Sequence, residues 1–480
     1  MLPDVFISPC EPPYDGDFLK SDNRICVALQ RIWTAMGLDA TNPFRDLLPQ
    51  GGTAVIKPNW VSHGGVNGCT LDCLVTHSAL IACLINCCAT AMNGEGVVVV
   101  GDAPIQGCDF ETLLTATGFR NIIDVFGQLY PKIDFQIQDW RLTVLPQYSS
   151  SGVLQSKQDY RDSQKTLEDN YLELDLGKQS FLEDIVDYSD RFRVAMYRPS
   201  LMQRHHGPGK HQYLFRKEPL AANLLINVAK MKTHMKAGLT GALKNLVGIN
   251  GHKEYLPHHI QGSFFAGGDA YCRDNFFAAL ADDIYDHLWE NRNNFGILRR
   301  WFQGQLLRAA HYAAKLTGRD QIDSGSWCGN ETIWRMVLDL NHAVYFGAQH
   351  PDHILNIVDG VIAGEGDGPL SPTPKPLGMI FAGENPAHID AVLARIMGYN
   401  LSRIPMVYQA IYHRKSEFGG TDISDIPVRW IGNACESTTL RQLPSVGFTP
   451  PHHWRRALAK LEAPAAEDNE RHCCHHCQAE

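Results

Sequence analysis

Short hydrophobic runs, each followed by polar residues, recur along the chain. Five of them read TAVIKPNW, GVVVVGDAP, LLINVAKMK, HILNIVDG and LGMIFAGEN. Continuous apolar runs of this length are typical of strands that are buried on both faces of a parallel sheet. The runs therefore predict strands whose ends carry polar side chains, namely those of Lys57, Asn59, Asp102, Lys230, Lys232, Asp359, Glu384 and Asn385.

Helical patterns follow most of these strands. They cover residues 78–92, 110–117, 240–247 and 388–397. Strands that alternate with helices predict an α/β fold, in which a mostly parallel sheet is flanked by helices. The segments YLELDLGKQSFLEDI and DRFRVAMYR suggest short antiparallel strands instead, so we expect an inserted irregular or antiparallel middle region.

The 480 residues are enough for two or three domains. Within them, residues 293–316 predict an amphipathic helix with Arg299, Arg300 and Arg308 on its polar side. We expect this helix to pack on the surface of the core, and contact with a membrane surface is the alternative. The pattern divides the chain into an N-terminal α/β part (1–144), an inserted region (145–222), a basic and helical part (223–350), a C-terminal α/β part that completes the sheet (351–450), and a helix with a disordered tail (451–480).

Composition narrows the class of protein. The net charge is −9, with 44% hydrophobic and 20% charged residues. This balance is ordinary for a globular protein and argues against nucleic acid as a partner. The most apolar helical stretch is shorter than the ~20 residues needed to span a bilayer, and the first residues show no signal-peptide pattern. We therefore expect a soluble cytoplasmic protein without an integral membrane segment.

The fourteen cysteines do not suggest a disulfide framework. Cys83, Cys87 and Cys88 share one apolar helical segment, where we expect them to be small core side chains. The tail HCCHHC, residues 472–477, favours a disordered end over a metal site. A second set of cysteines and histidines has a spacing that suggests metal binding. It lacks a paired CxxC or HxxxH, so a metal site is the less favoured interpretation of this set. That set is His63, Cys69, Cys73 and His77.

Residues 224–259 hold an unusual concentration of positive charge. The segment contains five lysines and four histidines against one acid, Glu254. In open α/β sheets, ligands bind outside the carboxyl ends of the strands. If the predicted strands share one sheet, these residues form a wall of a binding site. A tight turn with solvated lysines is the alternative interpretation.

The same segment supplies most of the candidate catalytic residues. A glycine-rich helix start suits an anion, because its backbone N–H groups are free. Histidine titrates near neutral pH, and a lysine crowded by other cations loses pKa and becomes a base or nucleophile. We predict catalytic roles for Lys232, His234, Lys244 and Asp102. The predicted substrate-binding residues are Lys57, Asn59, Thr240, Gly241, Asn245 and Lys253.

An acidic, glycine-rich loop offers a hypothesis for a cofactor. Asp359, Glu365 and Asp367 lie in VDGVIAGEGDGP. Carboxylates on such a loop suit Mg²⁺ or a polar substrate, and a plain mobile loop is the other interpretation. The sequence identifies no cofactor beyond this hypothesis of a divalent metal ion.

Several motifs together resemble the DUF362 family, a group of proteins of unassigned function. They are AVIKPNW, VVVVGDAP, KTHMKAGLTGALKN, SWCGNETIWRMVLDLN and LNIVDGVIAGEGDGP, spread from about residue 50 to about residue 405. The chain looks like the longer subgroup of this family. Some relatives carry a ferredoxin-like module with C-x₂-C-x₂-C-x₃-C-P runs, and this sequence has none, so the resemblance implies no iron–sulfur cluster.

The sequence therefore favours an enzyme that acts on a small anionic substrate. The substrate would bear phosphate or carboxylate, and the chemistry would be acid–base catalysis by Lys and His at the carboxyl ends of the parallel strands. A metal- or redox-linked protein and a non-catalytic anion-binding module are the alternatives. Neither the reaction class nor any macromolecular partner is predicted.

Overall fold

The computed structural model describes residues 2–20, 22–144, 161–162, 170–195, 197–291, 296–317, 324–432 and 434–458. The HCCHHC tail and most of the polar segment 145–170 lie outside these residues. The predictions made for these two regions therefore stay predictions.

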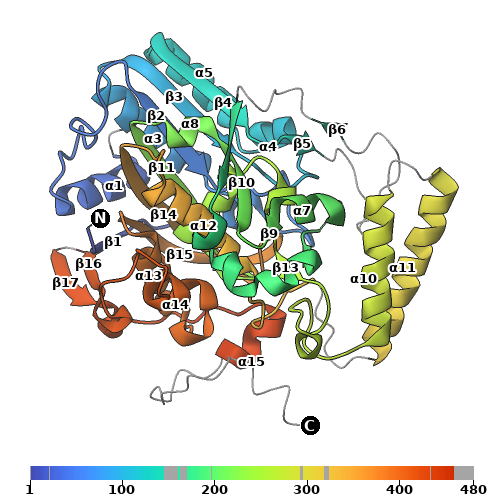
Figure 1. The fold of residues 1–480 in the computed structure, drawn as a ribbon. Helices are drawn as coiled ribbons and strands as arrows, with labels where there is room; N and C mark the ends of the chain where they lie inside the picture. Colours follow the sequence, from blue (N-terminus) through green and yellow to red (C-terminus); the bar gives the residue numbers. More distant parts are fainter. Residues whose placement is uncertain are drawn as a thin grey trace.

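One large sheet of ten strands organises the chain (Figure 1). Five neighbouring strands, β14, β11, β2, β3 and β4, run parallel to one another. This core confirms the predicted α/β fold with a mostly parallel sheet. In spatial order the strands are β17 (Cys435–Thr439), β16 (Pro427–Ile431), β1 (Val5–Pro9), β15 (Ser371–Gly383), β14 (His353–Asp367), β11 (Leu224–His234), β2 (Thr53–Pro58), β3 (Glu95–Asp102) and β4 (Lys132–Asp139), and β12 (Gly238–Thr240) pairs with β11.

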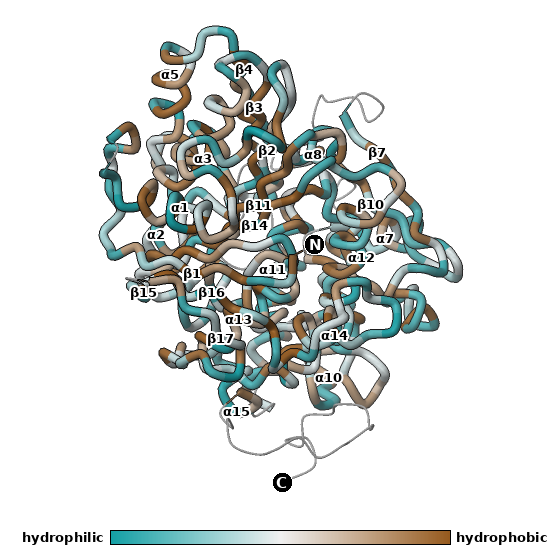
Figure 2. The backbone as a smooth tube through the Cα atoms, turned by 90° about the vertical axis from the view of Figure 1, so that its left-hand side faces the viewer, coloured by the Kyte–Doolittle hydropathy of each residue, from teal (hydrophilic) through white to brown (hydrophobic). Residues whose placement is uncertain are grey.

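Helices cover both faces of this sheet, and the strand residues alternate between two apolar layers. Val55 of β2 packs in the layer that contains α12 (Ile333–Phe346), α13 (Pro386–Met397) and α14 (Pro405–Tyr412). Ala54 and Ile56 pack in the opposite layer. That layer contains α1 (Arg24–Ala35), α3 (Ser78–Ala91), α4 (Phe110–Ala116) and α5 (Phe119–Leu129). Burial on both faces explains why these strands read as continuous apolar runs. Figure 2 shows the strands as brown segments at the centre of the molecule.

Three of the four predicted helices are confirmed as α3, α4 and α13. The fourth, predicted over residues 240–247, is replaced by shorter elements. The chain forms β12, then α9 (Ala242–Asn245) and a 3₁₀ turn, η3 (Leu246–Ile249). The hairpin of β12 with β11 takes residues 238–240 out of the helix, because those residues complete a ladder with Lys232 to His234.

One predicted strand runs in the opposite direction to the others. The strand of LGMIFAGEN is β15, which is antiparallel to β14, with Gly383 opposite Asn356. Glu384 and Asn385 therefore lie at the opposite edge of the sheet from Lys57 and Asp102. The expectation of one shared edge was wrong for these two residues, because the apolar run does not encode strand direction. Asn385 instead caps α13 by accepting from backbone N–H groups of Ala387 and His388.

The middle of the chain forms small antiparallel sheets, as the sequence predicts. β10 (Lys210–Arg216) pairs with β7 (Tyr171–Asp175) and β9 (His206–Gly207), and β8 (Phe192–Arg193) pairs with β13 (His259–Ile260). β5 (Thr143–Val144) pairs with β6 (Arg161–Asp162). The remaining short elements are α2 (Leu71–Leu74), η1 (Gly177–Gln179), η2 (Phe181–Arg191), α7 (Pro199–His205), α8 (Lys217–Leu220), η4 (Lys253–Tyr255), η5 (Phe264–Ala266), η6 (Leu401–Arg403), η7 (Ile423–Asp425), η8 (Leu440–Gln442), η9 (His452–Trp454) and α15 (Arg455–Leu458).

Two long helices, α10 (Phe276–Glu290) and α11 (Ile297–Thr317), form a hairpin beside the body (Figure 1). α11 corresponds to the amphipathic helix predicted over residues 293–316. Arg299 and Arg308 are exposed, but Arg300 is only 2% exposed, so its predicted place on the polar side was wrong. No helix within the described ranges is long and apolar enough to cross a membrane.

One cysteine expectation is also corrected. Cys83 of α3 forms a disulfide with Cys26 of α1. The sequence could not indicate this bond, because the two residues are 57 positions apart and meet only when the helices pack together. Cys87 and Cys88 are free thiols in the apolar layer, in accord with the prediction.

Candidate functional site

A buried ion pair joins the ends of β2 and β3. Lys57 Nζ lies 2.6 Å from Asp102 Oδ1 and also donates to the carbonyl oxygen of Pro58. Asp102 accepts two backbone hydrogen bonds, from Trp60 N at 2.7 Å and Ala103 N at 2.8 Å. The carboxylate is thus held in one orientation by Lys57 and by the two turns that follow the strands.

Gly248 lies directly against this ion pair. A Cβ atom added at Gly248 would overlap Asp102 Oδ1 and Lys57 Nζ. The carbonyl oxygen of Gly248 also accepts a hydrogen bond from Ala103 N at 2.9 Å. Glycine is therefore required here by close approach, and its place in the basic segment was the only feature of the sequence that pointed to this role.

An amide network connects the ion pair to Lys232. Lys232 Nζ donates to Asn59 Oδ1 at 2.8 Å and to the carbonyl oxygen of Leu74. Asn59 Nδ2 donates to Asn245 Oδ1 at 2.9 Å, and that oxygen is 3.4 Å from Lys57 Nζ. The structure thus brings together five of the predicted site residues, although they come from three segments far apart in the sequence.

The network continues across the sheet through two asparagines that the sequence analysis missed. Asn245 Nδ2 donates to Asn227 Oδ1 at 2.8 Å, and Asn227 Nδ2 donates to Asn356 Oδ1 at 2.8 Å. Asn227 and Asn356 are register partners on β11 and β14. A signal was present, because each residue is an isolated polar side chain inside an apolar run.

Lys244 and Lys253 lie beside the ion pair. Lys253 Nζ donates to the carbonyl oxygen of Ala103, next to Asp102, at 3.3 Å. Burial, followed by the charge of Lys253, lowers the pKa of Lys244 to about 7, and Asp102 acts in the opposite direction. Lys244 Nζ forms no hydrogen bond or ion pair with any residue that the structure describes. We call Lys57, Lys232, Lys244 and Lys253 the lysine cluster.

Positive charge in the lysine cluster is poorly compensated. Burial, followed by the charge of Lys230, lowers the pKa of Lys232 to about 7. Burial also lowers the pKa of Lys253 to about 8, although Asp102 opposes the shift. A cation whose pKa falls this far gains too little from nearby anions to offset its loss of hydration. An anionic ligand would supply the missing compensation.

His234 and His258 both lie near the charge of Lys244, and they differ in which ring nitrogen carries the proton. His234 Nδ1 accepts hydrogen bonds from the backbone N–H groups of Lys236 and Ala237, so the neutral ring carries its proton on Nε2. His258 Nδ1 lies 2.7 Å from the carbonyl oxygen of Leu256 and donates to it, so its Nε2 is an acceptor. Burial and the charge of Lys244 hold the pKa of both rings well below the ordinary value, which keeps them neutral.

Thr240 and Gly241 are placed differently from the predicted anion site. The backbone N–H groups of Ala242 and Leu243 donate to the two carboxyl oxygens of Asp390, at 2.6 and 3.2 Å. A Cβ at Gly241 would overlap Asp390, which explains the glycine. The start of α9 is thus occupied by a carboxyl group of the chain itself, and Thr240 is buried in β12.

A second buried ion pair lies on β11 and β14. Lys230 Nζ is 3.0 Å from Asp359 Oδ2 and 2.7 Å from the hydroxyl oxygen of Tyr14. Tyr14 donates to Asp359 Oδ1 at 2.7 Å, and its ring stacks on His77 at 3.7 Å. Asp359 also accepts from the backbone N–H of His77. Burial and the Asp359 charge raise the pKa of Tyr14 well above its ordinary value.

The three proposed metal ligands do not converge. Glu365 pairs with Lys375 at 3.0 Å, and Asp367 accepts from the backbone N–H of His452 at 2.8 Å. Asp359 is engaged by Lys230 and Tyr14 instead. Across the described part of the chain, no group of three or more His, Cys, Asp or Glu residues could hold a metal ion.

The second set of candidate metal ligands does not come together as one site. Of His63, Cys69, Cys73 and His77, the two cysteines lie close together. Cys69 Sγ and Cys73 Sγ are 3.5 Å apart. The hydrogen bond from Cys69, with smaller effects of Lys230 and Lys232, lowers the pKa of Cys73 to about 6. His63 accepts from the backbone of Asp109. The pair is therefore a close dithiol rather than part of a four-ligand site.

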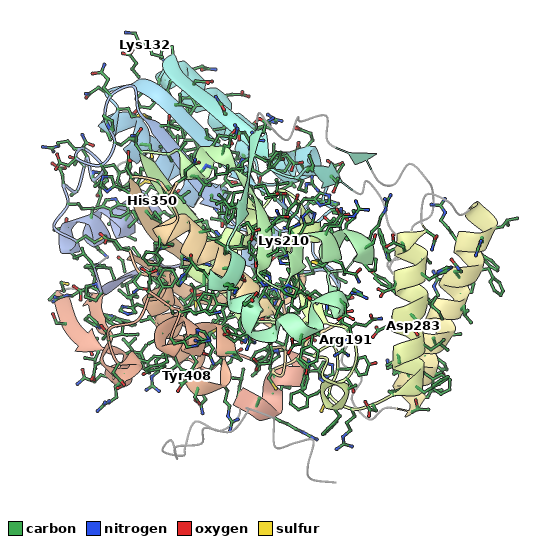
Figure 3. The ribbon with its side chains drawn as sticks, in the orientation of Figure 1. Lys132, Arg191, Lys210, Asp283, His350 and Tyr408 are labelled. Carbon is green, nitrogen blue, oxygen red and sulfur yellow. A yellow bond between two sulfur atoms is a disulfide. The ribbon has the colours of Figure 1, made fainter. Side chains whose placement is uncertain are left out.

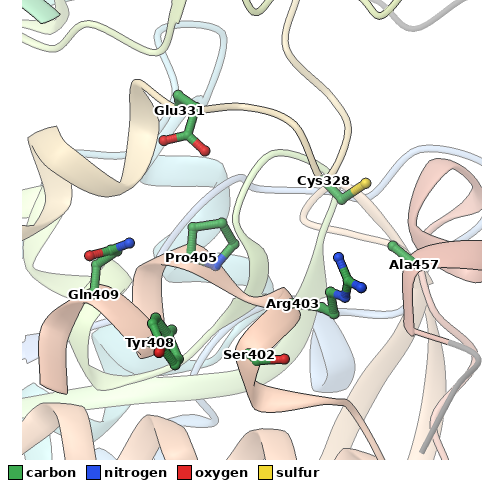
Figure 4. Close-up of a pocket in the computed structure, with 8 residues that line it drawn as sticks. All are labelled: Cys328, Glu331, Ser402, Arg403, Pro405, Tyr408, Gln409 and Ala457. Carbon is green, nitrogen blue, oxygen red and sulfur yellow. The ribbon is translucent and has the colours of Figure 1, made fainter. Parts of the chain in front are cut away.

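A shallow pocket is found away from all predicted residues (Figure 4). None of its lining residues belongs to the lysine cluster. They are Cys328, Glu331, Ser402, Arg403, Pro405, Tyr408, Gln409 and Ala457.

The fold and the lysine cluster define an α/β protein with a buried, positively charged centre at the carboxyl edge of a parallel sheet. A comparison with protein families matches residues 185–395 of the 480 to DUF362, described as a domain of unknown function. This confirms the resemblance. The matched range contains Lys232, Lys244 and Lys253, whereas Lys57 and Asp102 precede it. No curated protein and no solved structure matches the chain.

Proposed function

We propose that the chain is an enzyme that binds a small phosphate- or carboxylate-bearing substrate at the lysine cluster and transfers protons there. The observation that carries this proposal is the imbalance of charge around Asp102. That carboxylate is already bonded to Lys57 and two backbone N–H groups, while Lys232, Lys244 and Lys253 lie within its field. Lys232 is buried and Lys244 and Lys253 are half-buried, and cations with so little counter-charge favour an anion as their ligand.

Lys244 is the proposed general base. Its pKa of about 7 means that roughly half of the amines are neutral at neutral pH, where a base works best. Its lack of hydrogen bonds within the described residues leaves its Nζ lone pair available. His234 is proposed to donate a hydrogen bond to the substrate, because its neutral ring carries the proton on Nε2 while backbone N–H groups hold Nδ1 as the acceptor.

The other residues of the cluster bind and orient the substrate in this proposal. Lys232 and Lys253 supply charge, and the amides of Asn59 and Asn245 fix the position of Lys232 through hydrogen bonds. Asp102 acts by holding Lys57 in place. The proposal gives no ligand role to the helix start at Gly241, because Asp390 accepts its backbone N–H groups, and substrate binding by Thr240 and Gly241 stays a prediction.

A redox-linked function is the second candidate, and the dithiol of Cys69 and Cys73 favours it. The sulfur atoms are close, and the pKa of Cys73 is lowered to about 6, so a thiolate is present at neutral pH. Hydrogen peroxide would oxidise the two thiols to a disulfide and be reduced to water. Peptide mapping that finds Cys69 linked to Cys73 after mild peroxide treatment would support this candidate. A non-catalytic anion-binding role and a cytoplasmic location stay predictions.

Calorimetric titration with inorganic phosphate tests the proposal. The wild-type chain should bind phosphate near pH 7, and Lys253→Met should bind it roughly 10- to 100-fold more weakly, because a charged hydrogen bond contributes about 1.5–3 kcal/mol. Lys20→Met is the matched control, since Lys20 is an exposed lysine paired only with Asp17. Equal affinity in all three proteins would refute the site.

Turnover separates an enzyme from a binding module. We expect one or more phosphate- or carboxylate-bearing metabolites to be converted by the wild-type protein and not by Lys244→Met, with an activity that rises through pH 7. Phosphate binding without conversion of any compound in a broad panel would favour the binding module instead.

A further inference from the structure

The outer helix of the α10–α11 hairpin has an unusual composition. α11 reads ILRRWFQGQLLRAAHYAAKLT and contains no Asp or Glu. Four of its residues are cationic, namely Arg299, Arg300, Arg308 and Lys315. In a chain of net charge −9, a 21-residue helix without an acid is a local reversal of charge.

The acidic residues of the hairpin are on α10, and two of them bind the body of the protein. Asp286 Oδ2 accepts from Arg193 Nε at 2.9 Å, and Glu290 Oε1 accepts from Ser200 Oγ at 2.7 Å. Figure 3 labels a further acid of α10, Asp283. These bonds fix α10 as the inner helix, so α11 is the outer one, as Figure 1 shows.

The side of α11 that packs on α10 is small and apolar. Leu307 and Ala310 are buried in one cluster with Leu288 and Trp289 of α10. Ala314, one turn further on, is also fully buried. The apolar contacts that hold the hairpin together are therefore complete without the opposite side of α11.

That opposite side is also apolar, and it is open to solvent. The exposed fractions are 81% for Leu298, 63% for Trp301, 64% for Phe302 and 70% for Leu316. Leu306 and Tyr312 are exposed between them. At 100° per residue these six positions form one stripe about 140° wide, with Arg299 along one border and Arg308 and Lys315 along the other.

The start of α10 carries a further exposed aromatic side chain. Asn275 Nδ2 donates to the carbonyl oxygen of Ala314, which places the first turn of α10 beside the last turn of α11. Phe276, at that turn, is one of the most exposed aromatic side chains described. We call this surface, made of Leu298, Trp301, Phe302, Leu306, Tyr312, Leu316 and Phe276, the hairpin face.

The apolar side chains of the hairpin face and the cations beside them indicate what kind of partner it binds. Contiguous exposed apolar side chains of this number mark an interaction site rather than ordinary surface. A second copy of the chain, docked α11 against α11, would bring the bordering cations of both helices together with no acid on either helix. A bilayer that contains anionic lipid offers acyl chains to the stripe and negative headgroups to both borders, which is the arrangement of an interfacial amphipathic helix.

We propose that the hairpin face binds the surface of an anionic lipid membrane. α11 lies in the plane of the interface, its aromatic and leucine side chains enter the headgroup–acyl boundary, and Arg308 and Lys315 contact lipid phosphates. The body of the protein stays in water, held to the membrane through α10. This inference does not depend on the function proposed for the lysine cluster.

Vesicle flotation of the full chain tests the proposal. The wild-type protein should float with vesicles of 30% phosphatidylserine in phosphatidylcholine, at the low ionic strength where headgroup attraction is strongest. The double variant Trp301→Ser/Phe302→Ser should partition roughly tenfold or more weakly, and Arg308→Glu/Lys315→Glu should lose binding in the same vesicles. Leu129→Ser is the matched control, because Leu129 is an exposed leucine on α5 and should bind like the wild type.

Three outcomes would overturn the proposal. The first is the absence of wild-type flotation with phosphatidylserine vesicles. The second is equal flotation of the wild type and both double variants. The third is a dimer, seen by light scattering without lipid, that Trp301→Ser/Phe302→Ser dissociates, which would assign the hairpin face to a second copy. Circular dichroism of each variant confirms that its helices are intact.

Discussion

Two buried ion pairs lie on the parallel part of the sheet, and their surroundings differ. Asp359 meets one cation, Lys230, and its remaining acceptor positions are filled by Tyr14 and backbone N–H groups. Asp102 also meets one cation closely, but Lys232, Lys244 and Lys253 add positive charge around it. The first pair is balanced and complete, which is typical of a structural element.

The difference shows why burial of a charge does not by itself identify a site. In both pairs, removing the charges from water costs free energy, and the hydrogen bonds of each pair reduce that cost. Only the surroundings of Asp102 leave cations that a ligand could neutralise. We therefore assign stability to Lys230 and Asp359, and ligand binding to the lysine cluster.

The largest effect expected from this comparison is a change in the free energy of unfolding. Lys230→Met leaves Asp359 buried without its cation, so we expect a loss of about 3–5 kcal/mol in the free energy of unfolding, measured by urea denaturation. The double variant Lys230→Met/Asp359→Leu removes both charges and should recover most of that loss. If Lys230→Met is as stable as the wild type, the pair is not the structural element described.

A second effect on stability, of up to about 2 kcal/mol for each of three lysines, is expected from pH. The pKa values of Lys232, Lys244 and Lys253 are about 7, 7 and 8 in the folded protein, below the ~10.4 of an unfolded lysine. Between these limits the unfolded chain binds more protons, so stability should rise from pH 7 to pH 9. Below pH 6.5, neutral His234 and His258 should lower stability further, because the unfolded imidazoles take up protons.

Lys244→Met sharpens this pH test. Removing one of the three lysines should reduce the rise between pH 7 and pH 9, and should not destabilise the protein at pH 7. Urea denaturation at both pH values measures the rise. A variant that unfolds more easily at pH 7, with an unchanged pH dependence, would make Lys244 a structural residue.

Much of the fold followed from the sequence, because burial on both faces of a parallel sheet leaves a simple pattern. Val97 to Val100 and the apolar half of β11 could be recognised as strands, and α3 and α13 as helices. Once those strands are parallel, Lys57, Asp102 and Lys232 must share an edge. Strand direction is not in the pattern, and so Glu384 and Asn385 were assigned to the wrong edge.

The parts of the site that escaped prediction depend on long-range contacts. The start of α9 looked like an anion site because its glycines are local, but Asp390 reaches it from a helix that begins 145 residues after Gly241 (386 − 241). Tyr14 reaches Asp359 from the N-terminal segment in the same way. Asn227 and Asn356 could have been found, since a lone amide in an apolar strand needs a polar partner.

Proton uptake on anion binding is the most direct test of the uncompensated charge. We would titrate the protein with sulfate, which does not itself titrate near neutral pH, by calorimetry at pH 8 in two buffers of different ionisation enthalpy. The account predicts uptake on the order of one proton per chain, because the bound anion raises the pKa values of Lys232 and Lys253 from about 7 and 8. Sulfate that binds without proton uptake, or with proton release, would contradict it.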